Sequence, residues 1–230
     1  MKQNKILKFG HRGAKAYVAE NTLESVLKAL ELGVDGVEID VHKCKSEELV
    51  VFHDFTLDRL TNAEGEISNF NLTDLKQLQI SNTYKIPTLI QVLDLVNNSC
   101  IVNIELKGKN TAFKTVTIIE DYIKNKNWNY NNIIISSFNF EELLSVYKIN
   151  KKIPLGVLIE SNLESAITFA KSINAVAIHP DYNMLTKSNV KKIQNNGFKV
   201  NTWTVNTVKD IEKIKSYNVN AIISDFPDRL

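Results

Sequence analysis

Short apolar runs alternate with longer amphipathic segments along most of the chain. Many residues in the runs are β-branched, which is typical of strands. These predicted strands lie at residues 6–9, 37–41, 101–106, 133–136, 155–159, 175–178, 199–204 and 221–224. The intervening segments carry apolar residues three and four positions apart, which predicts helices. These predicted helices lie near residues 23–33, 87–96, 111–125, 140–148, 163–171, 187–195 and 207–217.

The alternation of strands and helices predicts an α/β fold built on a parallel sheet. Eight strand–helix units favour a closed (β/α)8 TIM barrel. The chain ends at Leu230, six residues after Ser224, so we expect the eighth helix to be absent or vestigial. A doubly wound open sheet is the alternative. It is weakened by the first loop, Gly10-His11-Arg12-Gly13, which is not the glycine-rich phosphate loop of that fold.

Residues 54–85 interrupt the alternation. They are largely polar, include a turn-prone stretch around Gly65, and begin directly after His53, which follows an apolar run at 49–52. Their apolar residues are too few for an independent core. We therefore expect one TIM-barrel domain over residues 1–230, in which residues 54–85 form a small insertion cap after the second strand, with a short helix near 73–78.

The first predicted helix has recognisable ends. Asn21 is placed to cap its start, and Glu24 stands at the reciprocal capping position. Gly33 follows its last apolar residue, as expected at a helix end. In the later predicted helix at 87–96, Pro87 is expected to occupy the first turn.

Composition narrows the function classes. The chain has 28 basic and 26 acidic residues, a net charge of +2, and no basic run of the kind that binds nucleic acid. Its two cysteines, Cys44 and Cys100, are too far apart in sequence for a zinc or redox motif. No apolar run has the length of a signal peptide core or a membrane span. We therefore expect a cytoplasmic protein without stable membrane insertion.

Two acids occupy the second predicted strand. Glu38 and Asp40 are two residues apart and share one face, whereas the apolar Val37, Ile39 and Val41 share the other. The apolar face suits burial under helices, so the carboxylates are expected to face the barrel interior. Two neighbouring carboxylates are unfavourable to bury without a cation between them. A solvated strand end is the alternative.

The third predicted strand repeats this pattern. Asn103, Glu105 and Lys107 share the inward face, so Glu105 is a third candidate ligand and Lys107 a candidate phosphate contact. A simple Glu105–Lys107 ion pair is the alternative. Three carboxylates without clustered cysteine or histidine favour a hard cation such as Mg²⁺, Ca²⁺ or Mn²⁺ over Zn²⁺.

Histidines end two of the apolar runs. His11 and His53 each follow such a run, at the strand ends where barrel active sites lie. Imidazoles transfer protons near neutral pH, so both are candidate acid–base catalysts. His42 shares a face with Glu38 but is expected further into the loop, and His179 is expected only to approach the site.

Two further residues are candidate substrate contacts. Arg12 follows His11 and could bind a phosphate through its guanidinium group. Trp203 lies at the end of the predicted strand 199–204, where it could form a wall for the carbon skeleton of a ligand. Core packing is the alternative for Trp203.

As an ordered set, the chemical motifs resemble those of the glycerophosphodiester phosphodiesterase family over nearly the whole chain. The matching segments are His11-Arg12-Gly13, Glu20-Asn21-Thr22, Glu38-Ile39-Asp40-Val41, His53-Asp54, Leu57-Asp58-Arg59, Thr61, Ile86-Pro87-Thr88-Leu89, Glu105-Leu106-Lys107, Trp203-Thr204-Val205-Asn206 and Ser224-Asp225-Phe226-Pro227.

The resemblance implies a TIM barrel with a small insertion and hydrolysis of glycerophosphodiesters to sn-glycerol 3-phosphate and an alcohol. It implies a divalent metal, usually Mg²⁺ or Ca²⁺, with acid–base catalysis by two histidines and phosphate contacts from two basic residues. The corresponding residues here are Glu38, Asp40 and Glu105 for the metal, His11 and His53 for catalysis, and Arg12 and Lys107 for phosphate.

The chain departs from the family pattern outside these positions. Ala19 replaces a common proline, Ile90-Gln91 replaces a common acid, and a glycine usual before the last strand is missing.

Two alternatives for the function stay open. One is a phospholipase D-like or lysophospholipase D-like barrel enzyme that acts on lipids, and the other is a non-catalytic barrel scaffold. The choice of acid and base, the attacking group and the oligomeric state also stay open.

Overall fold

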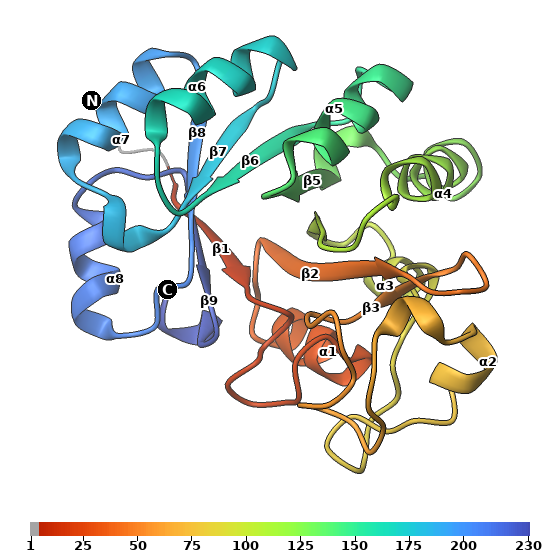
Figure 1. Cartoon of the computed structure of the whole chain (residues 1–230). Coiled ribbons are helices and arrows are strands. Elements are labelled where there is room, and N and C mark those ends of the chain that lie inside the picture. Colours follow the sequence, from red (N-terminus) through yellow and green to blue (C-terminus); the bar gives the residue numbers. More distant parts are fainter. Residues whose placement is uncertain (1–4) are drawn as a thin grey trace.

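The computed structural model describes residues 5–230. Within this range, eight parallel strands form a closed ring, because β1 pairs with both β9 and β2. Figure 1 shows the strands with helices arranged around them. This confirms the predicted TIM barrel and excludes the open sheet. The barrel strands are β1 (Leu7–Gly10), β2 (Gly36–Lys43), β4 (Ile101–Leu106), β5 (Ile133–Ser137), β6 (Leu155–Ile159), β7 (Ala177–Pro180), β8 (Lys199–Thr202) and β9 (Ala221–Ser224).

Helices connect the successive strands of the barrel. After β9 the described chain forms only a short 3₁₀ turn, Pro227–Arg229, as the sequence predicted. None of the helices in residues 5–230 is long and apolar enough to cross a membrane. The connecting helices are α1 (Leu23–Glu31), α3 (Leu89–Val96), α4 (Ala112–Asn125), α5 (Phe140–Ile149), α6 (Leu163–Ser172), α7 (Lys187–Asn195) and α8 (Val208–Lys215).

The ends of several elements differ from the prediction. Helix α3 begins at Leu89 rather than Pro87, because Thr88 forms a capping box with Gln91. Strand β7 extends through Pro180, and β8 ends at Thr202. Such ends depend on capping and pairing, which periodicity does not specify.

The two faces of β2 follow the alternation in its sequence. Val37, Ile39 and Val41 are fully buried in one apolar cluster with side chains of α1 and α3. Burial of each such side chain contributes roughly 1.5–3 kcal/mol. Their anchoring holds β2 in register, so that the intervening side chains of Glu38 and Asp40 point to the other face.

The loop from β1 to α1 brings polar side chains back over the barrel end. Gly13 has a φ of 86°, and a Cβ there would lie 2.5 Å from the backbone of Ser25. Thr22, not Asn21, caps α1, because its side chain accepts a hydrogen bond from the Ser25 N–H. The prediction that Asn21 is the cap is therefore wrong, and Glu24 takes no part in a capping box.

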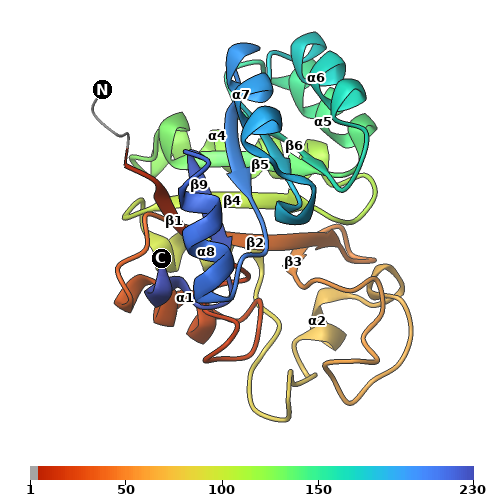
Figure 2. The same ribbon diagram turned by 90° about the vertical axis from the view of Figure 1, so that its left-hand side faces the viewer.

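The insertion follows a hairpin in which β3 (Leu49–Val51) pairs antiparallel with β2. Figure 2 shows the insertion alongside this hairpin, below β3 at the lower right. Its short helix, α2 (Leu72–Leu75), begins one residue before the predicted position and ends three residues before it. Residues from the hairpin and the insertion form a separate apolar cluster that includes Phe52, Leu57, Ile67, Leu75 and Ile80.

Candidate active site

The register between β2 and β4 brings three carboxylates together. Asp40 lies directly opposite Glu105, and Glu38 is two residues before Asp40 on β2. All three side chains are buried, and one oxygen of each lies within 4.8 Å of the other two. The three candidate metal ligands therefore form one cluster.

Burial and crowding make this cluster unfavourable in its fully ionised form. Burial, followed by repulsion from Asp40 and Glu105, raises the pKa of Glu38 well above its usual range. Burial, followed by repulsion from Asp40, raises the pKa of Glu105 to about 7. The buried side-chain oxygen of Asn103, on the same face of β4, has no hydrogen-bond partner within residues 5–230. This all-oxygen donor set fits a hard divalent cation.

Two basic side chains lie beside the acidic cluster. The Arg12 backbone N–H donates to Glu38 at 2.9 Å, while its guanidinium lies 3.5 Å from Asp40 and 2.6 Å from Glu20. Lys107 donates to Glu105 at 3.1 Å. The Glu105–Lys107 ion pair considered as an alternative is thus present, within the cluster rather than in place of it.

His11 is held by a residue from the opposite end of the chain. Its Nδ1 lies 2.6 Å from Asp225, which follows β9 and also accepts a hydrogen bond from Asn206 at 2.8 Å. Its Nε2 lies 3.9 Å from Glu38. Burial lowers the pKa of His11, and the hydrogen bond to Asp225 partly opposes this shift.

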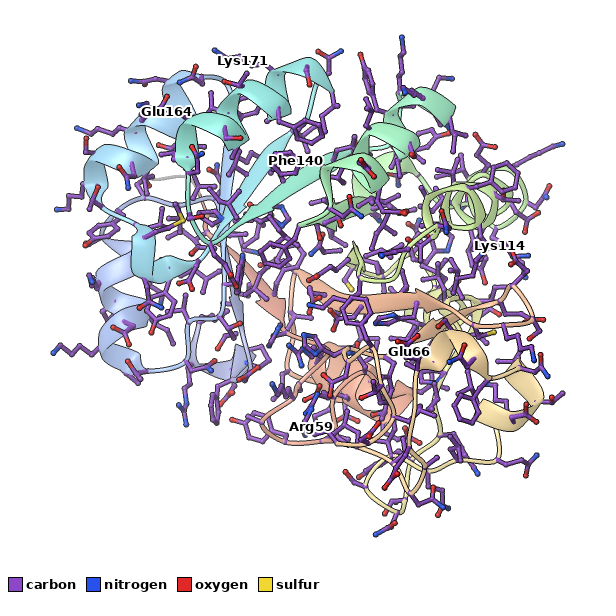
Figure 3. All side chains as sticks on the ribbon, viewed as in Figure 1. Arg59, Glu66, Lys114, Phe140, Glu164 and Lys171 are labelled. Atoms are coloured by element: carbon purple, nitrogen blue, oxygen red, sulfur yellow. The ribbon has the colours of Figure 1, made fainter. Side chains whose placement is uncertain are left out.

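His53 is held by the insertion. Its Nδ1 lies 2.6 Å from Asp54, which in turn accepts hydrogen bonds from Arg59 at 2.6 and 2.9 Å. Arg59 also donates to Glu20 at 2.7 Å, which ties the insertion to the β1–α1 loop. Figure 3 shows Arg59 among the loops near α1. Burial is again the main cause that lowers the pKa of His53.

Glu20 forms ion pairs with both Arg12, beside the acidic cluster, and Arg59, in the insertion. Burial alone would raise the pKa of Glu20, but hydrogen bonds and charges from Arg59, Arg12 and Lys15 lower it to about 2. Glu20 therefore stays ionised near neutral pH. It fixes both arginines at the edge of the site.

A cavity of about 260 Å³ opens above these groups. One side is polar and includes His11, Arg12, Glu38, His53, Glu105 and Lys107. The other side is mostly apolar and includes Phe138, Leu158, Glu160, Trp203 and Ile223. Trp203 thus lines the cavity, and its indole N–H donates to the His179 carbonyl at 2.8 Å.

The structure places the two remaining histidines outside the lining of this cavity. His42 lies within β2 rather than in a loop, and its Nε2 is 3.1 Å from the His53 carbonyl, so it supports the loop that carries His53. His179 is buried on β7, where Nε2 lies 3.0 Å from the Asn201 side chain. Its backbone carbonyl accepts the hydrogen bond from Trp203, and it does not line the cavity.

Sequence reasoning missed the residues that orient the histidines and the acids. Asp225, Asp54 and Arg59 lie in segments that match the family motifs, but periodicity gives them no role. Asn21 is also such a residue: its side chain donates to Asp40 at 2.8 Å. The motif Glu20-Asn21-Thr22 was the available signal, although its contact with β2 requires the fold.

Comparison with known proteins gives a consistent result. The model of the glycerophosphoryl diester phosphodiesterase family matches residues 11–229. A glycerophosphodiester phosphodiesterase of Caldanaerobacter subterraneus is 35% identical over 236 residues, which cover 98% of this chain and 96% of the relative. One from Bacillus subtilis is 29% identical over 249 residues, covering 98% and 85%, respectively.

Solved structures agree with these sequence matches. An Oleispira antarctica phosphodiesterase, in complex with the product sn-glycerol-3-phosphate, has a TM-score of 0.88 and 26% identity, and the match covers 96% of this chain and 93% of that one. A glycerophosphodiester phosphodiesterase of Thermotoga maritima has a TM-score of 0.81 and 28% identity, with coverage of 98% and 96%. The chain therefore belongs to the glycerophosphoryl diester phosphodiesterase family.

Proposed function

We propose that the protein hydrolyses glycerophosphodiesters to sn-glycerol 3-phosphate and an alcohol, using a divalent metal and two histidines. The observation that carries this proposal is that two imidazoles line one cavity with Glu38 and Glu105, whose carboxylates cluster with that of Asp40. The product bound to the Oleispira antarctica relative supports the choice of substrate.

In this scheme Glu38, Asp40 and Glu105 hold Mg²⁺, Ca²⁺ or Mn²⁺. When bound, the cation polarises the phosphoryl oxygens and stabilises charge in the transition state. Arg12 and Lys107 add positive charge next to the cluster, so they bind and orient the phosphate. Trp203 forms part of the wall for the carbon skeleton.

The two histidines are prepared for proton transfer in the same way. Each donates its Nδ1 hydrogen to a carboxylate, His11 to Asp225 and His53 to Asp54, which leaves Nε2 for the substrate. One neutral imidazole accepts a proton from the attacking hydroxyl, which belongs to water or to the glycerol 2-position. The other imidazole, protonated, donates a proton to the leaving alcohol.

The size of the cavity favours a small diester. Its volume of about 260 Å³ lies just below the roughly 300–1,000 Å³ typical of sites for drug-sized ligands. The insertion at residues 54–85 supplies Asp54 and Arg59 beside the site. We propose that it acts as a cap within a single domain that spans residues 1–230.

The direct test is product formation by the purified protein. Glycerophosphocholine, glycerophosphoethanolamine, glycerophosphoglycerol and lysophosphatidylcholine would each be incubated with Mg²⁺, Ca²⁺, Mn²⁺ or EDTA, and sn-glycerol 3-phosphate would be measured. We expect metal-dependent release from the three glycerophosphodiesters. Absence of release from all of them, or full activity in EDTA, would contradict the proposal. Choline release from lysophosphatidylcholine alone would favour the lipid-acting alternative.

A further inference from the structure

The apolar side of the cavity contains a carboxylate that the proposed mechanism does not use. Glu160 directly follows β6 and lines the cavity with Phe138 and Trp203. Glu160 is exposed, and within residues 5–230 no side chain or backbone N–H donates a hydrogen bond to its carboxylate or forms an ion pair with it. The acids of the metal cluster, in contrast, are buried and contact basic side chains.

Two aromatic rings line the same cavity as this carboxylate. The rings of Phe138 and Trp203 meet edge to face, with centroids 5.5 Å apart and an interplanar angle of 90°. The hydrogen bond from the Trp203 indole to the His179 carbonyl fixes that ring. Leu158 and Ile223 complete this side of the cavity, and both are at least 95% buried.

Aromatic faces beside a carboxylate are a typical environment for an organic ammonium group. One cation already lies near these rings: Lys107 Nζ is 5.8 Å from the Phe138 centroid. Lys107 is also paired with Glu105 at 3.1 Å, so its charge is balanced on the polar side. On the aromatic side, no basic side chain of residues 5–230 pairs with the negative charge of Glu160.

We propose that Glu160, Phe138 and Trp203 form a subsite for the positively charged alcohol group of a zwitterionic glycerophosphodiester, such as one that contains choline or ethanolamine. This inference rests on the proposed function, because it assigns the alcohol side of the same substrate. The phosphate then lies on the polar side, near Arg12 and Lys107. A neutral alcohol such as glycerol gains no charge interaction from Glu160.

The first test measures binding without turnover. The chain has two tryptophans, and Trp128 is buried against Tyr122, away from the cavity. In a Trp128→Phe background, fluorescence therefore reports Trp203 alone. We expect choline to change this signal at saturating concentration, and Glu160→Gln to weaken choline binding about fivefold, the size expected for one partly exposed cation contact.

The second test measures specificity. We expect Glu160→Gln to lower the ratio of kcat/KM for glycerophosphocholine to that for glycerophosphoglycerol by about fivefold. The matched control is Glu141→Gln, which changes an exposed acid in the first turn of α5 that does not line the cavity. Its ratio should stay within about twofold of the parent value.

The outcomes separate this proposal from the proposed function. If the parent hydrolyses the diesters but Glu160→Gln keeps both the choline affinity and the specificity ratio, the ammonium subsite is wrong and the hydrolase stands. If choline binds and Glu160→Gln weakens it, but no diester is hydrolysed, the subsite stands and the proposed function is wrong. The subsite would also be overturned if Glu141→Gln changed the kcat/KM ratio of the two diesters as much as Glu160→Gln does.

Discussion

His11 and His53 line the same cavity but are held by different parts of the molecule. His11 follows β1 and is oriented by Asp225, which follows the neighbouring strand β9. His53 is oriented by Asp54, which is held by Arg59 of the insertion. The side chain of His53 is also twice as exposed, at 25% against 13%.

The barrel therefore orients His11, whereas the insertion orients His53. Closure of the ring between β1 and β9 is enough to place His11. The orientation of His53 depends on loops outside the barrel, which contact the β1–α1 segment through the Arg59–Glu20 ion pair. Changes in the insertion should therefore act on His53 and leave the His11–Asp225 pair intact.

The largest expected effect is loss of either imidazole. His11→Ala and His53→Ala should each lower kcat at least ~10²-fold, the usual contribution of general acid–base catalysis. Metal binding should persist in both variants, because neither side chain belongs to the carboxylate cluster. Steady-state kinetics with glycerophosphocholine check this prediction, and near-normal turnover by either variant would remove that histidine from the mechanism.

The next effect concerns the carboxylates that orient the histidines. Asp225→Ala and Asp54→Ala should lower kcat roughly 10- to 100-fold, as with other carboxylates that orient a functional imidazole. The hydrogen bond that His11 donates to Asp225 raises the pKa of His11, and the one to Asp54 acts likewise on His53, so each substitution should lower the pKa of its histidine.

The pH–rate profile then distinguishes the two roles. The base must be deprotonated, so a lower pKa moves the acid limb to lower pH and widens the bell. The acid must be protonated, so a lower pKa moves the alkaline limb to lower pH and narrows the bell. One of the two variants should widen the profile and the other should narrow it. Two shifts of the same kind would contradict the division of roles.

A smaller effect is expected at the link between the insertion and the barrel. Arg59→Met should lower kcat about fivefold, because a partly exposed ion pair contributes roughly 1 kcal/mol or less. Lys15→Met is the matched control: Lys15 also approaches Glu20, at 3.5 Å, but contacts neither histidine. Its kcat should fall less than about twofold. Equal effects in the two variants would show that Arg59 has no particular role in orienting His53.

The local periodicity of the sequence predicted the barrel and the convergence of the acids. Glu38 and Asp40 alternate with apolar residues that pack against the helices, so the direction of their side chains follows from the sequence alone. Glu105 obeys the same rule on the neighbouring strand. These features depend only on alternation along a strand and on the order of strands in a closed ring.

The residues that orient the site could not be predicted in this way. His11 and Asp225 are 214 positions apart, and their contact exists only because the ring closes. Asn21 has the residue type of a helix cap, but the fold places it against Asp40 and leaves the cap to Thr22. Such contacts depend on loop paths, which apolar periodicity does not encode.

The catalytic roles proposed for His11 and His53 both depend on the proposed metal at Glu38, Asp40 and Glu105. Without a cation, burial and repulsion raise the pKa of Glu38 and bring that of Glu105 to about 7. A divalent cation favours the ionised carboxylates, so its binding should release protons near neutral pH and weaken as the pH falls below 7.

Calorimetric titration of the chelated protein with Ca²⁺ or Mg²⁺, in two buffers of different ionisation enthalpy at about pH 6.5, measures affinity and proton release together. We expect proton release on binding by the parent and by the control Glu141→Gln. Glu38→Gln, which keeps the shape but removes a charge, should bind at least about tenfold more weakly. Absence of binding by the parent, or unchanged affinity in Glu38→Gln, would contradict the assignment of this cluster as the metal site.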